Sequence, residues 1–140
     1  MPGPIVDRIV AHCLDGYPLE ACGLLAGPAA PDPADARPAP ETEVVRAYPA
    51  ANAAASARVY TVEPRDLLRA DRDAEGAGLE LVGVWHSHTH TEAYPSPTDV
   101  AQAPDPAWHY LIVSLRDTEP VLRSYRITNG KIAEEHVVVQ

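Results

Sequence analysis

The sequence predicts a mixed α/β fold, and three features of the 140-residue chain support this prediction. Apolar residues recur at helical spacing near the N-terminus, apolar runs of strand length follow through the middle, and three consecutive strand-like segments close the chain. Apolar residues make up 46% of the chain and charged residues 22%, as in ordinary globular proteins. A chain of this length buries about 68–70% of its unfolded surface, so we expect a single domain over residues 1–140.

The first elements follow from apolar spacing and from glycine and proline positions. Ile5, Ile9 and Cys13 share one face of a helix, which Gly16 and Pro18 should end. Five prolines in the segment after the first strand predict a flexible surface loop over residues 28–42. The predicted order is a helix over Pro4–Tyr17, a buried strand over Glu20–Gly27, the loop, and a strand over Glu43–Tyr48.

The second half alternates strands and helices before it ends in strands. Pro64 suits the first turn of a helix, and Asn129-Gly130 is typical of a hairpin turn. We expect a strand over Val59–Val62, a helix over Glu63–Ala77, a strand over Leu79–Trp85, a short helix from Thr98 to about Pro104, and strands over Trp108–Leu115, Pro120–Ile127 and Ile132–Val139.

The charge balance excludes several classes of partner. The formal net charge of −9 argues against nucleic-acid binding, which depends on clustered Lys and Arg. No apolar run approaches the ~18 residues of a membrane span, and no signal peptide is visible, so we expect a cytoplasmic protein. Cys13 and Cys22 are too few for a disulfide framework or a cysteine-only zinc site.

The segment after the Leu79–Trp85 strand carries the residues that indicate chemistry. His86 and His88 are two residues apart, so strand alternation sends both side chains to one face. Asp99 follows ten residues later, at the start of the short helix. Two histidines and one aspartate are three ligands, and a zinc ion with three protein ligands keeps a fourth position for water, as catalytic sites do.

A hydrolytic site also needs a base near its water, and spacing alone does not identify it. Glu20 is one candidate because it precedes an apolar strand, where a carboxylate would be partly desolvated. From the residues alone, an ordinary exposed turn carboxylate is the favoured interpretation of this position. His90 lies one strand period beyond His88 and is read as an ordinary surface histidine.

The motif as a whole resembles the signature of the JAMM/MPN+ (Mov34/PAD-1-like) zinc metallopeptidases: an upstream Glu, His-x-His, ten residues, then Asp. These are Glu20, His86-Ser87-His88 and Asp99, and Pro95 to Asp99 resembles the family's Pro-Ser-x-x-Asp run. The resemblance implies a cytidine-deaminase-like α/β/α fold around a central mixed sheet. It also implies that His86, His88 and Asp99 bind Zn²⁺, that Glu20 moves the proton, and that Ser96 stabilises the oxyanion.

Within the family, the segment His88 to Ser96 is most similar to the bacterial Mec-type members. That resemblance implies a peptidase in cysteine biosynthesis that releases cysteine from a ubiquitin-like sulfur-carrier protein (CysO/ThiS/MoaD-like) with a C-terminal Gly-Gly. Because relatives are often dimers, it also suggests a homodimer. The alternatives are an isopeptidase that removes a ubiquitin-like modifier from lysines, a non-catalytic MPN scaffold, and a RadC-like relative, whose usual His-Asn-His-Pro differs from the His-Ser-His-Thr here.

The sequence leaves one feature of substrate recognition open. A released amino acid carries a carboxylate that a cation would pair with. Arg58, Arg65 and Arg116 are candidates, and nothing in the sequence selects among them.

Overall fold

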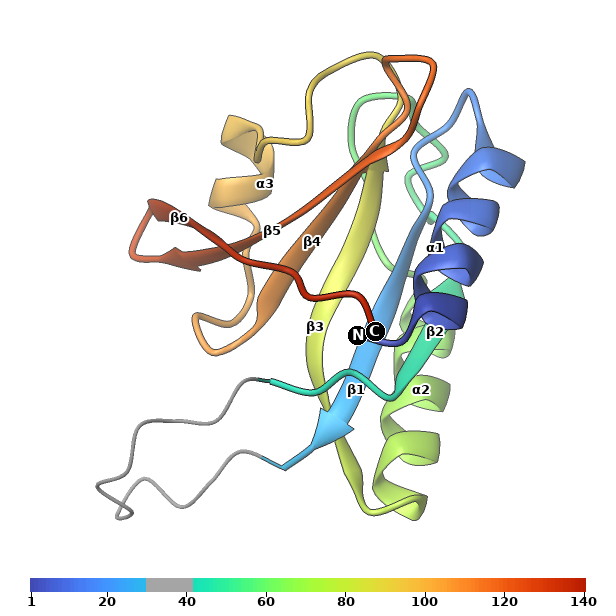
Figure 1. The fold of residues 1–140 in the computed structure, drawn as a ribbon, viewed down its shortest axis with the longest axis vertical. Coiled ribbons are helices and arrows are strands. Elements are labelled where there is room, and N and C mark those ends of the chain that lie inside the picture. Colours follow the sequence, from blue (N-terminus) through green and yellow to red (C-terminus); the bar gives the residue numbers. More distant parts are fainter. Residues whose placement is uncertain (30–41) are drawn as a thin grey trace.

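The fold is built on one six-stranded mixed sheet in the order β2-β1-β3-β4-β5-β6 (Figure 1). The computed structural model describes residues 1–29 and 42–140. β3 and β4 are parallel, and every other neighbouring pair is antiparallel. The strands are β1 (Cys22–Pro28), β2 (Arg46–Ala50), β3 (Leu79–His88), β4 (His109–Ser114), β5 (Val121–Thr128) and β6 (Lys131–Glu135).

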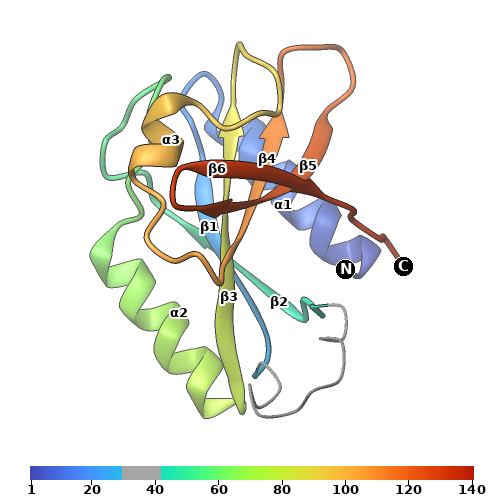
Figure 2. The ribbon, with the colours of Figure 1, turned by 90° about the vertical axis from the view of Figure 1, so that its left-hand side faces the viewer.

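Helices cover both faces of this sheet (Figure 2). Helix α1 (Gly3–Gly16) lies on one face, and α2 (Pro64–Gly76) and α3 (Pro97–Ala101) lie on the other. Strand alternation fills two cores: Leu25 and Trp85 pack with α1, whereas Leu24 and Val84 pack with α2. The expected α/β/α architecture around a central mixed sheet is therefore confirmed. None of the described helices is both long and apolar enough to cross a membrane.

The centre of the sheet requires one position without a side chain. A Cβ at Gly23 would lie 2.2 Å from the indole of Trp85 and 2.4 Å from the carbonyl oxygen of Tyr48. Glycine therefore lets the largest core side chain lie directly on β1. Cys13 and Cys22 are both free and buried.

Three strand predictions need correction. Residues Val59–Val62 form no strand, only an isolated bridge between Asn52 and Val62, because the Asn52 side chain accepts the hydrogen bond of a backbone N–H in this segment. The last strand ends at Glu135, since the residues beyond it pair with the N-terminus, where Gly3 N donates to Gln140 O at 3.0 Å. The second strand begins at Arg46 rather than Glu43.

The central strand β3 is three residues longer than the sequence predicts. Trp85 is not its end, because pairing continues on both sides: His86 lies opposite Cys22 of β1, and His88 lies opposite Ser114 of β4. Both histidines are therefore held in regular strand geometry. The predicted loop over 28–42 falls largely on residues 30–41, which lie outside the described residues.

Candidate active site

Two imidazoles and one carboxylate converge on the sheet face that α2 and α3 cover. The Nε2 atoms of His86 and His88 are 3.1 Å apart. The Oδ2 atom of Asp99 lies 3.2 Å from the first nitrogen and 3.0 Å from the second. All three side chains are buried, with exposed fractions of 2%, 5% and 8%. The structure thus brings together the three residues that the sequence predicts as metal ligands.

The Asp99 carboxylate is aimed by the first turn of α3. Ser96 is the N-cap of this helix: its Oγ accepts from Asp99 N at 3.1 Å, and its backbone N donates to Asp99 Oδ2 at 2.8 Å. These reciprocal bonds form a capping box. Ser96 therefore lies next to the cluster and holds the Asp99 carboxylate in place.

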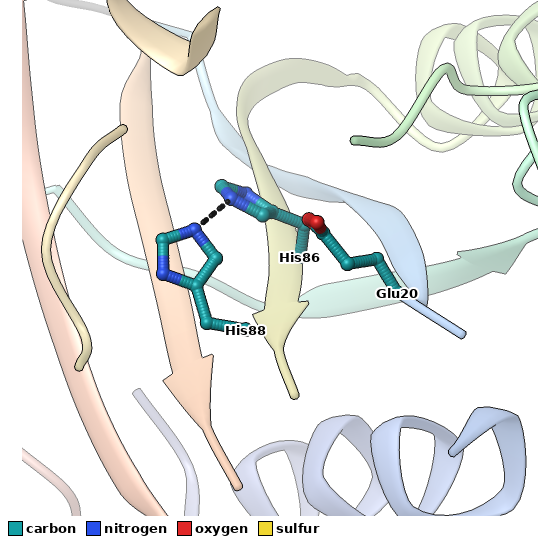
Figure 3. A group of neighbouring side chains, drawn as sticks. All are labelled: Glu20, His86 and His88. Atoms are coloured by element: carbon teal, nitrogen blue, oxygen red, sulfur yellow. Dashed lines mark hydrogen bonds between the residues drawn. The ribbon is translucent and has the colours of Figure 1, made fainter. Parts of the chain in front are cut away.

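Glu20 is the fourth polar group of the cluster. Its carboxylate lies within 4.8 Å of a ring nitrogen of each histidine, and Figure 3 shows it pointing toward the two imidazoles. The side chain is only 3% exposed, and Oε1 has no hydrogen-bond partner among the described residues. The alternative of an exposed turn carboxylate is therefore wrong.

Burial and neighbouring charges set the protonation of these groups. Burial raises the pKa of Glu20 to about 7, His88 opposes this rise and Asp99 adds to it. Burial lowers the pKa of His86 below its ordinary value, which favours the neutral imidazole. Burial acts against ionisation of Asp99, but hydrogen bonds with His86 and His88 outweigh it and hold its pKa well below the usual range.

The ring orientation of His88 is fixed from outside the cluster. Its Nδ1 lies 2.8 Å from the carbonyl oxygen of Glu92 and donates to it, so the neutral ring carries a bare lone pair on Nε2. Burial lowers the pKa of His88, but the bonds with Asp99 and the Glu92 carbonyl outweigh burial and raise it overall. The ring of His86 stacks on Tyr60, with centroids 4.2 Å apart and planes at 19°.

This arrangement fits a divalent metal ion. His88 Nε2 and the ionised Asp99 Oδ2 lie 3.0 Å apart, and a shared proton joins them in the metal-free protein. When the ring is neutral with its proton on Nδ1, both atoms offer lone pairs, and a metal cation can take the place of that proton. Around a tetrahedral zinc ion with ligand bonds of about 2.0–2.1 Å, ligand atoms lie about 3.3 Å from one another. The three observed separations are close to this value. Nitrogen and oxygen donors also suit zinc chemically.

Other candidates from the sequence lie outside the cluster. His90 is exposed, and its ring nitrogens lie near Tyr17 Oη and Thr89 Oγ1 rather than the other histidines. Sequence reasoning did not anticipate the Glu92 carbonyl as the partner of His88, because a backbone group carries no sequence signal. The stacking of Tyr60 on His86 was not predicted either, since the two residues lie on separate segments.

Comparisons with known proteins identify the family of this chain. Residues 2–128 match the family of prokaryotic homologs of the JAB domain. A CysO-cysteine peptidase of Mycobacterium tuberculosis is 43% identical over 136 residues, 96% of this chain and 86% of that protein. A desampylase of Haloferax volcanii is 37% identical over 77% of this chain and 74% of its own. A probable TtuB-protein conjugate cleaving protease of Thermus thermophilus is 33% identical over 74% of this chain and 62% of its own.

Solved structures share the fold of this chain. The solution structure of a protein from Desulfitobacterium hafniense superposes with a TM-score of 0.82 at 33% identity, covering 100% of this chain and 93% of the other. A JAB1/MPN domain protein from Archaeoglobus fulgidus shares the fold, with a TM-score of 0.56 at 16% identity over 99% of this chain and 95% of its own. Because the family match covers most of the chain, this protein belongs to the prokaryotic homologs of the JAB domain.

Proposed function

We propose that this protein is a zinc-dependent peptidase that cleaves after the C-terminal Gly-Gly of a ubiquitin-like sulfur-carrier protein and releases cysteine. The observation that carries the proposal is the convergence of His86, His88 and Asp99, whose ligand atoms lie 3.0–3.2 Å apart in a buried cluster beside Glu20. The 43% identity to a CysO-cysteine peptidase supports the substrate class. The released product assigns the reaction to cysteine biosynthesis.

The ligand set that we propose is His86, His88 and Asp99, with Glu20 left free. Asp99 lies within hydrogen-bond distance of both imidazole nitrogens, whereas Glu20 Oε1 has no hydrogen-bond partner among the described residues. A bound zinc ion supplies Lewis acidity and lowers the pKa of a coordinated water toward neutrality. A carboxylate close to the ligands but not bound by them is in the position that a general base requires.

Glu20 and Ser96 carry the proton and charge steps of the proposed mechanism. The Glu20 carboxylate takes a proton from the attacking water and delivers it to the nitrogen of the leaving amine. Burial raises the pKa of Glu20 to about 7 in the metal-free protein, and a nearby cation favours its ionised form, which is the form that accepts the proton. The Oγ of Ser96 accepts a hydrogen bond from Asp99 N, which leaves the hydroxyl proton for the oxyanion of the tetrahedral intermediate.

The test is cleavage of a CysO-like carrier that ends in Gly-Gly-Cys, followed by intact mass. We expect loss of one cysteine residue, inhibition by a chelator and recovery on adding zinc. Glu20→Gln is the matched control, because it keeps the shape and all three proposed ligands but has no basic carboxylate. A wild-type rate in Glu20→Gln would remove Glu20 from the mechanism.

The second candidate function is an isopeptidase that removes a ubiquitin-like modifier from protein lysines. It is favoured by the similarity to a desampylase and to a probable protease for TtuB-protein conjugates. The same enzyme preparation, given a carrier joined to a lysine side chain, distinguishes the two. Cleavage of the lysine conjugate with no release of cysteine would favour the isopeptidase.

A further inference from the structure

We propose that Arg58 binds the α-carboxylate of the amino acid released from the carrier and so determines the specificity for the leaving group. This inference rests on the peptidase function proposed above. It follows from the position of the loop that carries Arg58, residues 51–62, which lies against the cluster of Glu20, His86, His88 and Asp99.

The segment just before Arg58 is tied to both sides of the site. The backbone N–H of Glu20 donates to the carbonyl oxygen of Ser56 at 2.8 Å. On the other side, the hydroxyl of Thr89, which directly follows the second site histidine, donates to the carbonyl oxygen of Ala57 at 3.3 Å. The two residues that precede Arg58 therefore bridge the chain segments that supply the proposed base and the proposed ligands.

The segment after Arg58 is equally fixed. Tyr60 stacks on the imidazole of His86, at a centroid distance of 4.2 Å. The backbone N–H of Arg58 itself donates to Ser56 Oγ at 3.0 Å. Arg58 therefore lies between two segments that contact the site residues, and its backbone is held in place at the edge of the site.

One half-buried side chain holds the rest of this loop together. Asn52 Nδ2 donates to the carbonyl oxygens of Glu20 at 3.0 Å and Val59 at 3.1 Å. Asn52 Oδ1 accepts from the backbone N–H groups of Ala54 at 3.0 Å and Thr61 at 2.9 Å. This network fixes the loop without using the guanidinium group of Arg58, so loss of that group should leave the loop in place.

Among the three arginines that the sequence left open, Arg58 alone is both available and held at the site. Its side chain is exposed, and within residues 1–29 and 42–140 its guanidinium forms no hydrogen bond or ion pair. Arg116 is already paired with Asp117 at 3.4 Å. Arg65 lies in the first turn of α2, and no hydrogen bond links it to the site residues.

The chemistry of the leaving group explains why a cation is needed here. When a single residue is released, the carbon of its α-carboxylate lies only two bonds, about 2.5 Å, from the scissile nitrogen. Moving this carboxylate from water into the site costs hydration free energy unless a cation pairs with it. An arginine binds a carboxylate with two parallel hydrogen bonds and offsets this cost. A lysine side chain in an isopeptide bond has no carboxylate at this position, so Arg58 favours a free C-terminal amino acid.

The experiment compares two carriers that differ only at the terminal group: one ends in cysteine as the free acid, the other in cysteine amide. Wild type should prefer the acid by about 10- to 100-fold in kcat/KM. Arg58→Ala should lose this preference by slowing only the acid substrate, and Arg58→Lys should retain part of it. Arg65→Ala is the control and should behave as wild type.

Three results overturn the inference. Equal kcat/KM for acid and amide in wild type would mean that no group reads the carboxylate, while leaving the peptidase function intact. An equal loss on both substrates in Arg58→Ala, at unchanged zinc content, would make Arg58 a structural residue of the loop. If wild type with full zinc content cleaves neither carrier, the proposed function and this inference fail together.

Discussion

Replacing Glu20 by Gln should abolish turnover and at the same time stabilise the metal-free protein in alkaline solution. The carboxylate is 3% exposed, its Oε1 atom has no hydrogen-bond partner within residues 1–29 and 42–140, and its pKa is raised to about 7 by burial. An ionised group in such a place costs folding free energy, which the neutral amide does not. The carboxylate proposed as the general base therefore lowers the free energy of unfolding of the metal-free protein in alkaline solution.

The size of this effect follows from the two pKa values. Glu20 titrates near 4.5 when unfolded and near 7 when folded. Because the folded-state pKa is the higher one, the free energy of unfolding falls as pH rises from 4.5 to 7 and stays lowered above pH 7. Between pH 5 and pH 8, wild type should lose about 2.5 kcal/mol more than Glu20→Gln, at 1.36 kcal/mol per pKa unit.

Urea unfolding of both proteins at pH 5 and pH 8, after treatment with a chelator, measures this difference. Comparing how the free energy of unfolding changes with pH in the two proteins cancels any pH-independent effect of the amide. Any contribution of the histidines also cancels, because both proteins contain them. Zinc-loaded wild type is the second control: a nearby divalent cation favours ionised Glu20, so its pH penalty should shrink. Equal pH dependence in the two metal-free proteins would show that Glu20 ionises as in water and would refute the reasoning.

Three further predictions test the ligand set, the sheet and an ion pair. Asp99→Ala should lower zinc affinity at least about 100-fold, measured by competition with a chromophoric chelator, and full zinc retention would contradict its role as a ligand. Gly23→Ala should destabilise the fold by about 1–3 kcal/mol in urea, since its Cβ meets the buried indole, whereas Gly76→Ala, with no atom within 4 Å, should be nearly neutral. Burial raises the pKa of Glu135, but its hydrogen bonds, chiefly with His109, outweigh burial and lower it. Glu135→Gln should therefore cost about 1–3 kcal/mol just above pH 4.5, and this cost should vanish as pH falls through the folded-state pKa; a constant cost would mean that the ionised carboxylate forms no stabilising contact with His109.

Local patterns predicted most elements because propensity and packing agree there. Apolar spacing and a first-turn proline marked α1 and α2, and both form close to the predicted bounds. Prediction failed where a hydrogen-bond partner outside the segment decides the outcome. The strand expected at Val59–Val62 is absent because Asn52 takes over its hydrogen bonding. The strand expected up to Val139 stops early because the C-terminal residues pair with the N-terminus.

By itself the sequence determined the chemical identity of the site: which residues carry imidazole and carboxylate groups, and that His86 and His88 share one strand face. Period-2 alternation and the spacing to Asp99 are local properties, so they can be read from the chain. Only the tertiary structure decided that Glu20 is buried, that the Glu92 carbonyl orients His88, and that the Arg58 loop is tied to the rim. Burial, pKa and the partners of backbone groups depend on segments that meet only after folding.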